Sequence, residues 1–346
     1  MPNCQEARWT LTGAQSGIWF AQQLEPENPI YNAGEYIEIN GKIDSECFEL
    51  ALRQAVKETE SLHIKFGVNE QGPWQVIRPA SDFPLHFFDV STEEHPQQAA
   101  QMWMNDDLAR PIDLRLDPLF CQALFKVSSN RFFWYQRIHH IVMDGFGFSL
   151  ISQRVASLYT ALINKLAYDE GAFAPLRLVL EEDLSYRASE DLLRDRQFWR
   201  DRFADGPEVI SLANRAPRTS KSVFRQTANL SPSITHSLQT AAHKFKGSWH
   251  ETLIAATAVY VHRLTGSQDV ILSLPMMGRL GSASLNTPSM VMNLLPLRLL
   301  VRPDMDFTEL VKQVSKEMRS AGKHQRYRHE ELRRDLKLLG ENQRLF

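Results

Sequence analysis

The sequence has few of the residues that build metal sites or disulfide frameworks. Its 346 residues include only three cysteines, Cys4, Cys47 and Cys121, which lie far apart and form no CxxC pair, and there is no HExxH pattern. Zinc needs three or four ligands at compatible spacing, so no metal site is expected. Scattered cysteines and the lack of a signal peptide predict a reducing cytoplasm.

The sequence also lacks an excess of positive charge and any long apolar run. The formal net charge is −2, whereas nucleic-acid binders carry a basic excess. No apolar stretch reaches the length that crosses a bilayer, and there are no repeats or low-complexity tracts. Nucleic acid and membrane are therefore not expected partners. With 23% charged and 43% hydrophobic residues, the composition is that of a globular protein with room for two lobes.

The most informative stretch is residues 138–149, with the sequence IHHIVMDGFGFS. The preceding residues 131–137 (RFFWYQR) are aromatic and apolar, which is typical of a buried strand. Residues 148–163 have the periodicity of a helix with one apolar face. The two histidines are therefore predicted where a strand ends and a loop leads into a helix, a common place for side chains that face a cleft.

The residue types in this loop suggest distinct roles. An imidazole titrates near neutral pH, so His140 could accept, donate or hold a proton. His139, its neighbour at a strand end, should point to the opposite side. Asp144 could anchor the loop through a buried cation or backbone N–H groups, and Gly145 fits a turn with positive φ or a close backbone approach. Two alternatives are a purely structural histidine pair and half of a zinc site.

HHIVMDG resembles the HHxxxDG signature of nonribosomal peptide synthetase condensation domains, which belong to the chloramphenicol acetyltransferase-like acyltransferases. Further stretches resemble other motifs of this family in the same order: residues 11–24, 58–66, 291–300 and 324–332. The resemblance implies a mixed α/β (α+β) fold with two acetyltransferase-like lobes in a V-shaped pseudo-dimer. The expected lobes are residues 1–170, which carry the signature, and 171–346, which should be incomplete at the C-terminus.

Periodicity and turn signals predict the main elements along the chain. Helices are expected at residues 11–24, from residue 45, and at 94–108, 181–203 and 251–264, with another after Ser231-Pro232. Strands are expected at 36–40, 62–68, 74–77, 224–230 and 270–275, with a hairpin of 118–127 and 131–139. Residues 214–222 are expected to form a polar loop.

The resemblance also implies roles for individual residues. His140 is the expected catalytic residue, and Arg279 should form a buried ion pair with Asp144. His139, Asp144, Gly145 and Arg279 would support the motif, and the candidates for the substrate cleft are Asn293, Ser282 and Met143. For Asn293, a satisfied amide in a buried strand is an equal alternative. Gly147 replaces a serine of many relatives and is expected to matter little.

Within the family, the runs WYQRIHHIVMDGFGFS and GRLGSAS are similar to condensation domains of aryl-capped siderophore synthetases. This similarity implies an amide-forming acyltransferase that joins a 2,3-dihydroxybenzoyl thioester to an aminoacyl thioester, glycyl. The expected partners are an upstream aryl carrier protein, a downstream peptidyl carrier protein and an adjacent adenylation domain. The domain itself should bind no cofactor, because the carriers bring phosphopantetheine arms. Alternatives are a coenzyme A-dependent acyltransferase, an epimerisation domain and a scaffold that only docks carriers.

Overall fold

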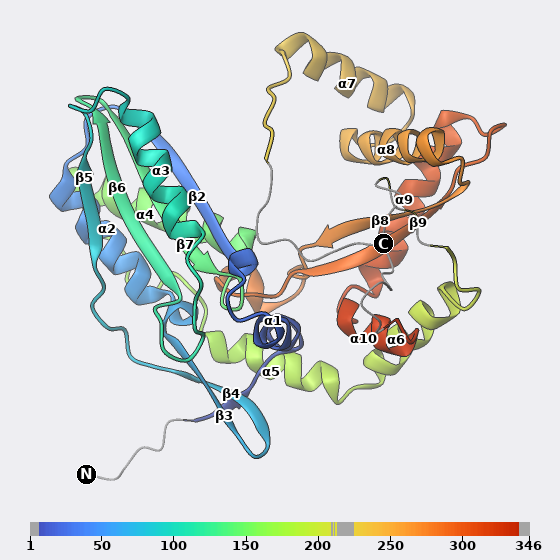
Figure 1. Ribbon diagram of the computed structural model, residues 1–346, viewed down its shortest axis with the longest axis horizontal. Helices are drawn as coiled ribbons and strands as arrows, with labels where there is room; N and C mark the ends of the chain where they lie inside the picture. The colour runs from blue at the N-terminus through green and yellow to red at the C-terminus, as the bar shows by residue number, and fades with distance from the viewer. Residues whose placement is uncertain (1–6, 209, 211, 213–224, 339–346) are drawn as a thin grey trace. The chain divides into compact units, whose positions relative to one another are not determined.

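The computed structural model describes residues 7–208, 210, 212 and 225–338 (Figure 1). The chain divides into two compact units. The first combines Met1–Ser185 with Arg279–Val291, and the second combines Tyr186–Gly278 with Met292–Phe346. The division at residue 170 predicted from the sequence differs from these units, which place both residues 171–185 and the returning segment Arg279–Val291 in the first unit.

The first unit is built on a four-stranded sheet with the strand order β2-β7-β6-β5. Its strands are β2 (Asn32–Asn40), β7 (Arg131–His139), β6 (Phe120–Ser128) and β5 (Leu85–Asp89). Neighbouring strands are antiparallel except β5 and β6, which run parallel. The predicted hairpin of 118–139 is thus confirmed, and it ends at His139.

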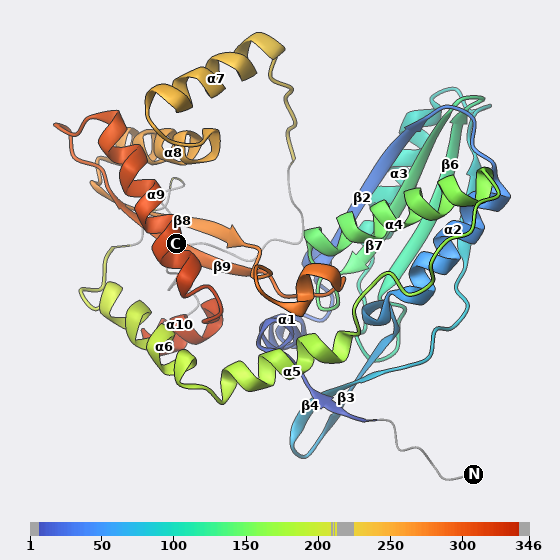
Figure 2. The same cartoon turned by 180° about the vertical axis from the view of Figure 1, so that it is seen from behind.

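Three helices cover the two faces of this sheet. Helix α3 (Pro96–Leu108) lies on one face, and α2 (Ser45–Glu58) and α4 (Gly145–Ile163) lie on the other, as Figures 1 and 2 show. Helix α2 buries the apolar stripe that its sequence predicts: Phe48, Ala51, Leu52, Ala55 and Val56. Burial of this stripe and of the matching sheet face supplies the main hydrophobic stabilisation of the unit.

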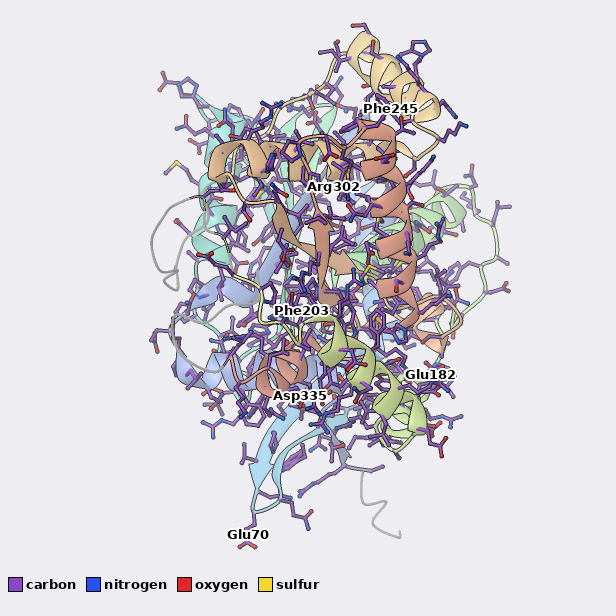
Figure 3. All side chains as sticks on the ribbon, turned by 90° about the vertical axis from the view of Figure 1, so that its right-hand side faces the viewer. Glu70, Glu182, Phe203, Phe245, Arg302 and Asp335 are labelled. Atoms are coloured by element: carbon purple, nitrogen blue, oxygen red, sulfur yellow. The ribbon has the colours of Figure 1, made fainter. Side chains whose placement is uncertain are left out.

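A smaller sheet and two more helices complete the first unit. The sheet has the order β1-β4-β3 and consists of β1 (Trp9–Thr10), β4 (Gly72–Ile77) and β3 (Ile64–Asn69). Glu70 marks the turn between β3 and β4 in Figure 3. The helices are α1 (Gly13–Leu24), which begins with a capping box at Thr12, and α5 (Leu176–Arg187). Short 3₁₀ turns are η1 (Pro29–Tyr31), η2 (Glu60–His63) and η3 (Ala283–Asn286).

The second unit has a two-stranded antiparallel sheet of β8 (Asp269–Met276) and β9 (Asn293–Leu300). Its helices are α6 (Glu190–Arg202), α7 (Pro232–Lys244), α8 (Trp249–Thr265), α9 (Phe307–Lys323) and α10 (His329–Asp335). One core lies between α8, α9 and the sheet, and includes Ala255, Ala258, Leu297, Leu299, Leu310 and Val314. Phe245, labelled in Figure 3, packs edge-on against Phe307 with ring centroids 4.8 Å apart.

Several predicted elements differ from the structure. The single helix expected at 181–203 is two helices, α5 and α6, because Ser189 precedes Glu190 and Asp191, acidic residues that favour a new N-terminus. Residues 225–230 form no strand. A sequence pattern typical of a strand is not sufficient without a neighbouring strand to pair with. Helix α8 is buried on one face only, and four of its large apolar side chains are exposed: Trp249, Leu253, Tyr260 and Leu264. The predicted loop 214–222 lies outside the described residues.

Candidate active site

The two histidines lie where β7 meets the loop that leads into α4. The His139 backbone N–H donates to Leu119 O at 2.8 Å, and the His140 N–H donates to Tyr31 O at 2.8 Å. Leu119 directly precedes the hairpin partner β6, and Tyr31 ends the 3₁₀ turn η1 before β2, so the end of the strand is held by two different segments. The loop then runs through residues 141–144 to the first turn of α4.

His139 is buried and has partners for both ring nitrogens. Its Nδ1 accepts the Ile141 N–H at 3.2 Å, which places the ring proton on Nε2, 3.4 Å from Gln22 Oε1. Burial, with a smaller effect of the His140 and Arg137 charges, lowers the pKa of His139 to about 3. The ring is therefore a neutral structural group, which agrees with the support role implied by the sequence.

The lowered pKa of His139 predicts a loss of stability in acid. The unfolded chain takes up this proton near its ordinary pKa of about 6.5, whereas the folded chain resists it until about pH 3. The stabilisation is thus complete above about pH 6.5 and declines as the pH falls toward 3. Between pH 7 and pH 5, the free energy of unfolding of the unmutated chain should fall by about 2 kcal/mol more than that of the His139→Gln variant. Urea denaturation at the two pH values measures this difference. The exposed His95, changed to Gln, is the control that should leave the slope unchanged.

His140 is oriented by the backbone of its own loop. Its Nδ1 lies 2.9 Å from the carbonyl oxygen of Met143, which can only accept, so Nδ1 carries the proton in the neutral ring. Nε2 then has a free lone pair, and no hydrogen bond to it from another described residue is recorded. The side chain is half-buried rather than enclosed. This geometry presents Nε2 as a hydrogen-bond acceptor, which suits a base or a group that positions an amine.

Asp144 connects the histidine loop to the segment that follows β8. It is 2% exposed, and its Oδ1 accepts the Phe146 and Gly147 N–H groups at 3.2 and 3.3 Å, which caps α4. Its Oδ2 accepts the Val291 N–H at 3.1 Å. The Asp144 N–H donates to Ser289 O at 3.2 Å. One carboxylate therefore fixes both the start of the helix and a distant part of the chain.

Arg279 forms the expected ion pair with Asp144. Its Nη2 lies 2.7 Å from Asp144 Oδ1, and the guanidinium is completely buried. The same side chain donates to three backbone carbonyl oxygens, those of Ser284, Thr287 and Ser289, and stands over the Phe146 ring at 4.9 Å. Arg279 therefore holds the returning segment 284–289 against the histidine loop. Charge-assisted bonds in a buried place are strong, so this contact gives the loop one geometry.

The two glycines of the motif have different surroundings from those expected. Gly145 has neither a positive φ nor a close neighbour: it is the first residue of α4, and an added Cβ would meet nothing within 4 Å. At Gly147, an added Cβ would lie 2.6 Å from Met143 Cγ. The sequence-based roles are therefore corrected. Gly147 provides space for Met143, whose carbonyl orients His140, and Gly145 meets no steric requirement.

These surroundings predict opposite results for two matched substitutions. Gly145→Ala should leave stability unchanged or raise it by up to about 1 kcal/mol, because it restricts the unfolded chain without a clash. Gly147→Ala should cost about 1–3 kcal/mol, because the buried Met143 side chain must move. Thermal unfolding of the two variants is the measurement. Equal stability of both would show that the packing of Met143 on Gly147 carries no constraint.

The three residues expected to line a substrate cleft have other contacts. The Met143 side chain is fully buried, so its role is packing rather than substrate contact. The Ser282 hydroxyl donates to Glu182 Oε2 at 2.5 Å and accepts the Ser284 N–H at 3.1 Å. The Asn293 side chain donates to Gln325 O and Tyr327 O at 2.9 and 2.7 Å. Its oxygen accepts the His329 N–H at 3.2 Å, so the contacts of Asn293 match the satisfied amide.

Sequence reasoning did not identify Glu182. Its second oxygen accepts the Ala283 N–H at 2.9 Å, so the carboxylate on α5 holds two successive residues at the start of the turn that begins at Ser282. This turn belongs to the segment that Arg279 draws toward Asp144. The signal in the sequence is weak, because residues 183–187 match the family motif poorly and an acidic residue on a helix is ordinarily solvated.

The described residues lack two further features. No three or more His, Cys, Asp or Glu side chains in residues 7–208, 210, 212 and 225–338 are grouped so that they could hold a metal ion. Within the same ranges, no helix combines the length and the apolar character needed to cross a bilayer.

Comparison with known proteins identifies the family of this arrangement. The family model described as "Condensation domain" matches residues 5–346. The chain is 62% identical over all 346 residues to a dimodular nonribosomal peptide synthase of Bacillus subtilis, and it covers 15% of that protein. It is 31% identical over 331 residues, 94% of this chain, to enterobactin synthase component F of Escherichia coli K12, and covers 25% of it. The chain thus spans a quarter or less of these relatives.

Solved structures agree with the sequence comparison. The starter condensation domain of rhizomide synthetase RzmA, a mutant form in complex with C8-CoA, matches with a TM-score of 0.92 and 39% identity. The match covers 98% of this chain and 77% of that one. The first condensation domain of the calcium-dependent antibiotic synthetase, with a substrate analogue, matches with a TM-score of 0.90 and 37% identity over 95% of this chain and 78% of that one. The fold, the oriented histidine and these matches lead to one conclusion: the chain belongs to the condensation-domain family of nonribosomal peptide synthetases, the amide-forming acyltransferases.

Proposed function

We propose that this domain joins a carrier-bound 2,3-dihydroxybenzoyl thioester to a carrier-bound glycyl thioester in the biosynthesis of a catechol siderophore such as bacillibactin. The runs around the histidines and Arg279 resemble those of the first condensation domain of bacillibactin synthetase and its enterobactin counterpart. Relatives named enterobactin synthase component F and vanchrobactin synthetase VabF support a siderophore product. An aryl carrier upstream, a peptidyl carrier downstream and an adenylation domain would be the partners, in the cytoplasm.

The orientation of His140 is the observation that carries this proposal. The contact of Nδ1 with Met143 O leaves the Nε2 lone pair to accept a hydrogen bond from the amine of the acceptor. The amine nitrogen attacks the thioester carbonyl carbon, the C–S bond breaks, and the thiol of the donor carrier leaves. The proton lost by the amine passes to Nε2 and from there to the departing thiolate. This acyl transfer involves no change of oxidation state, so it needs no cofactor bound to the domain.

The demands on His140 are modest because the substrates are already reactive. An α-amino group has a pKa of about 7.7–8.0, so an appreciable part of the acceptor is neutral near physiological pH. A thioester is an activated acyl group. Holding the two arms in an orientation suited to attack can supply about 7–11 kcal/mol of the barrier. The domain therefore acts mainly by positioning, and His140 sets the direction of the amine.

A fatty-acyl donor is the second candidate, and two comparisons favour it. The rhizomide neighbour was solved with C8-CoA, and a relative 44% identical over 98% of this chain is named isonitrile lipopeptide synthase. An acyl chain and an aryl group place different demands on a site, because the aryl group is rigid and carries two hydroxyls. The same carrier loaded with either group tests the two candidates side by side.

Intact-protein mass spectrometry of the acceptor carrier provides the test. Glycyl-loaded peptidyl carrier is mixed with this domain and with an aryl carrier that holds either 2,3-dihydroxybenzoyl or octanoyl. The proposal predicts that the acceptor gains the aryl-acyl mass quickly and the octanoyl mass slowly, and that neither appears without the domain. Faster octanoyl transfer would favour a fatty-acyl donor. Transfer of neither group would contradict the proposed substrates.

A further inference from the structure

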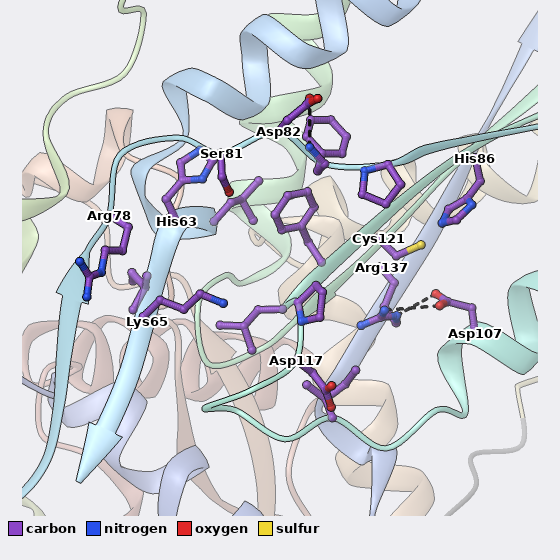
Figure 4. A pocket seen from close by; sticks show the side chains of 18 of the residues that line it. His63, Lys65, Arg78, Ser81, Asp82, His86, Asp107, Asp117, Cys121 and Arg137 are labelled. Atoms are coloured by element: carbon purple, nitrogen blue, oxygen red, sulfur yellow. Dashed lines mark hydrogen bonds and ion pairs between the residues drawn. The ribbon is translucent and has the colours of Figure 1, made fainter. Parts of the chain in front are cut away.

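The first unit contains a cavity of about 400 Å³ that His140 does not line. Its wall is formed by η2 and the start of β3, the loop before β5, the second half of α3, the loop before β6 and the start of β6, with Arg137 from β7 (Figure 4). The volume is within the range of about 300–1,000 Å³ found for small-molecule sites. The cavity belongs to one unit, so its shape depends on the packing of that unit alone.

The cavity combines an apolar interior with positive charge. Its apolar lining includes Ile64, Trp103, Ile112, Leu119 and the rings of Phe83 and Phe120, whose centroids lie 5.3 Å apart. Four basic side chains also line it, and Figure 4 shows Lys65 reaching from β3 toward the cavity. Neither Lys65 nor Arg110 forms an ion pair with any residue in the described part of the chain. Both side chains are exposed enough to turn toward an occupant.

Two of the three carboxylates that line the cavity are paired with cations. Asp82 pairs with Arg53 at 2.5 Å, Asp107 pairs with Arg137 at 2.7 Å, and Asp117 accepts the Asp113 N–H at 2.8 Å. Asp82 and Asp107 are therefore already neutralised by their own cations, and Asp117 has a backbone hydrogen bond but no ion pair to Lys65 or Arg110 in the described part of the chain. An anion that enters the cavity would meet two cations without ion-pair partners.

A buried guanidinium in the wall of the cavity also favours an anionic occupant. Arg137 lines the cavity and is 3% exposed. Its Nε donates to Asp107, whereas its Nη1 has no hydrogen-bond partner. A buried donor without an acceptor is costly, and native proteins contain few of them. Arg137 lines the cavity, so an occupant could offer a hydrogen-bond acceptor to Nη1 after a small shift of the Arg137 side chain.

We propose that this cavity is a binding site for a small carboxylate with an aromatic or apolar body. The ring would pack between Phe83, Phe120 and the aliphatic floor, and the carboxylate would face Lys65, Arg110 and the Arg137 side of the wall. The site is separate from the proposed acyl transfer, because it contains none of the residues of the histidine loop. It is linked to that loop through β7, which carries both Arg137 and His139, and through the lining residue Leu119, whose carbonyl oxygen accepts the His139 N–H.

Benzoate is a suitable probe, with benzyl alcohol as an uncharged molecule of similar size. Isothermal titration of the whole domain should show saturable benzoate binding at one site and at least about tenfold weaker binding of benzyl alcohol. The double variant Lys65→Met, Arg110→Met should bind benzoate at least about tenfold more weakly. Lys42→Met, an exposed lysine outside the cavity, is the matched control and should bind as the unmutated domain does.

Further arms keep the test independent of the acyl-transfer reaction. His140→Ala should bind benzoate unchanged, which shows that the benzoate is not in the histidine site. Thermal midpoints of all variants in the absence of benzoate check that each is folded. The absence of saturable binding would overturn the proposal. Equal affinity for benzoate and benzyl alcohol, or an unchanged affinity in the double variant, would overturn it as well.

Discussion

Replacing His140 by alanine should slow amide formation about 10²–10⁴-fold, the usual contribution of a positioned acid–base group. The neutral imidazole has a free lone pair on Nε2, since Nδ1 is bonded to Met143 O. Its removal takes away the acceptor for the amine while the loop keeps the Asp144 and Arg279 contacts. Single-turnover mass spectrometry of the acceptor carrier measures the rate directly.

Two observations separate a chemical role of His140 from a structural one. His140 is half-buried, so water can replace the ring at Met143 O and the thermal midpoint should change little. The exposed His95, changed to Ala, should keep the full rate and serves as the matched control. A His140→Ala domain that is stable and retains most of its activity would contradict the role proposed here. A domain that loses stability and activity together would point to a structural histidine instead.

Replacing Arg279 by alanine should destabilise the first unit by about 3–5 kcal/mol. The substitution leaves the Asp144 carboxylate buried without its cation, and it leaves three backbone carbonyl oxygens without the guanidinium. The segment 284–289 would lose its main attachment to the histidine loop. Urea denaturation followed by circular dichroism measures the effect.

The matched control for Arg279 is an exposed ion pair of the same chemistry. Arg194 and Asp191 on α6 pair with side chains 70% and 60% exposed, so Arg194→Ala should cost less than about 1 kcal/mol. A second comparison uses Asp144→Asn with Arg279→Met in one chain. This double variant should be more stable than the sum of the two single losses predicts, because neither partner is left charged alone. Additive losses would mean that the two residues act independently.

The local parts of the fold could be read from the sequence because they depend on neighbouring residues. The aromatic run 131–137 and the periodic run 148–163 predict the strand and the helix on either side of the histidines, and β7 and α4 are there. The stripe on α2 was predictable for the same reason. The pairing of Arg279 with Asp144 was expected only from the family resemblance, since the residues are 135 positions apart.

The remaining features of the site depend on contacts that no local pattern encodes. The different surroundings of Gly145 and Gly147 follow from where Met143 packs, and the direction of its side chain is fixed by the tertiary fold. The contact of Glu182 with the turn at Ser282 joins segments a hundred positions apart. The protonated nitrogen of His140 follows from a carbonyl within the same loop, but only the folded conformation brings the two atoms together.

In its neutral form, His140 carries its proton on Nδ1 and presents a bare Nε2. Nitrogen NMR of the domain with labelled histidine measures this directly, because protonated and bare ring nitrogens have well-separated shifts. Comparison with His140→Ala assigns the signals. We expect a protonated Nδ1 and a bare Nε2 in the neutral ring. A neutral His140 with its proton on Nε2 would contradict it, because such a ring could donate to an oxyanion but could not accept a hydrogen bond from the attacking amine.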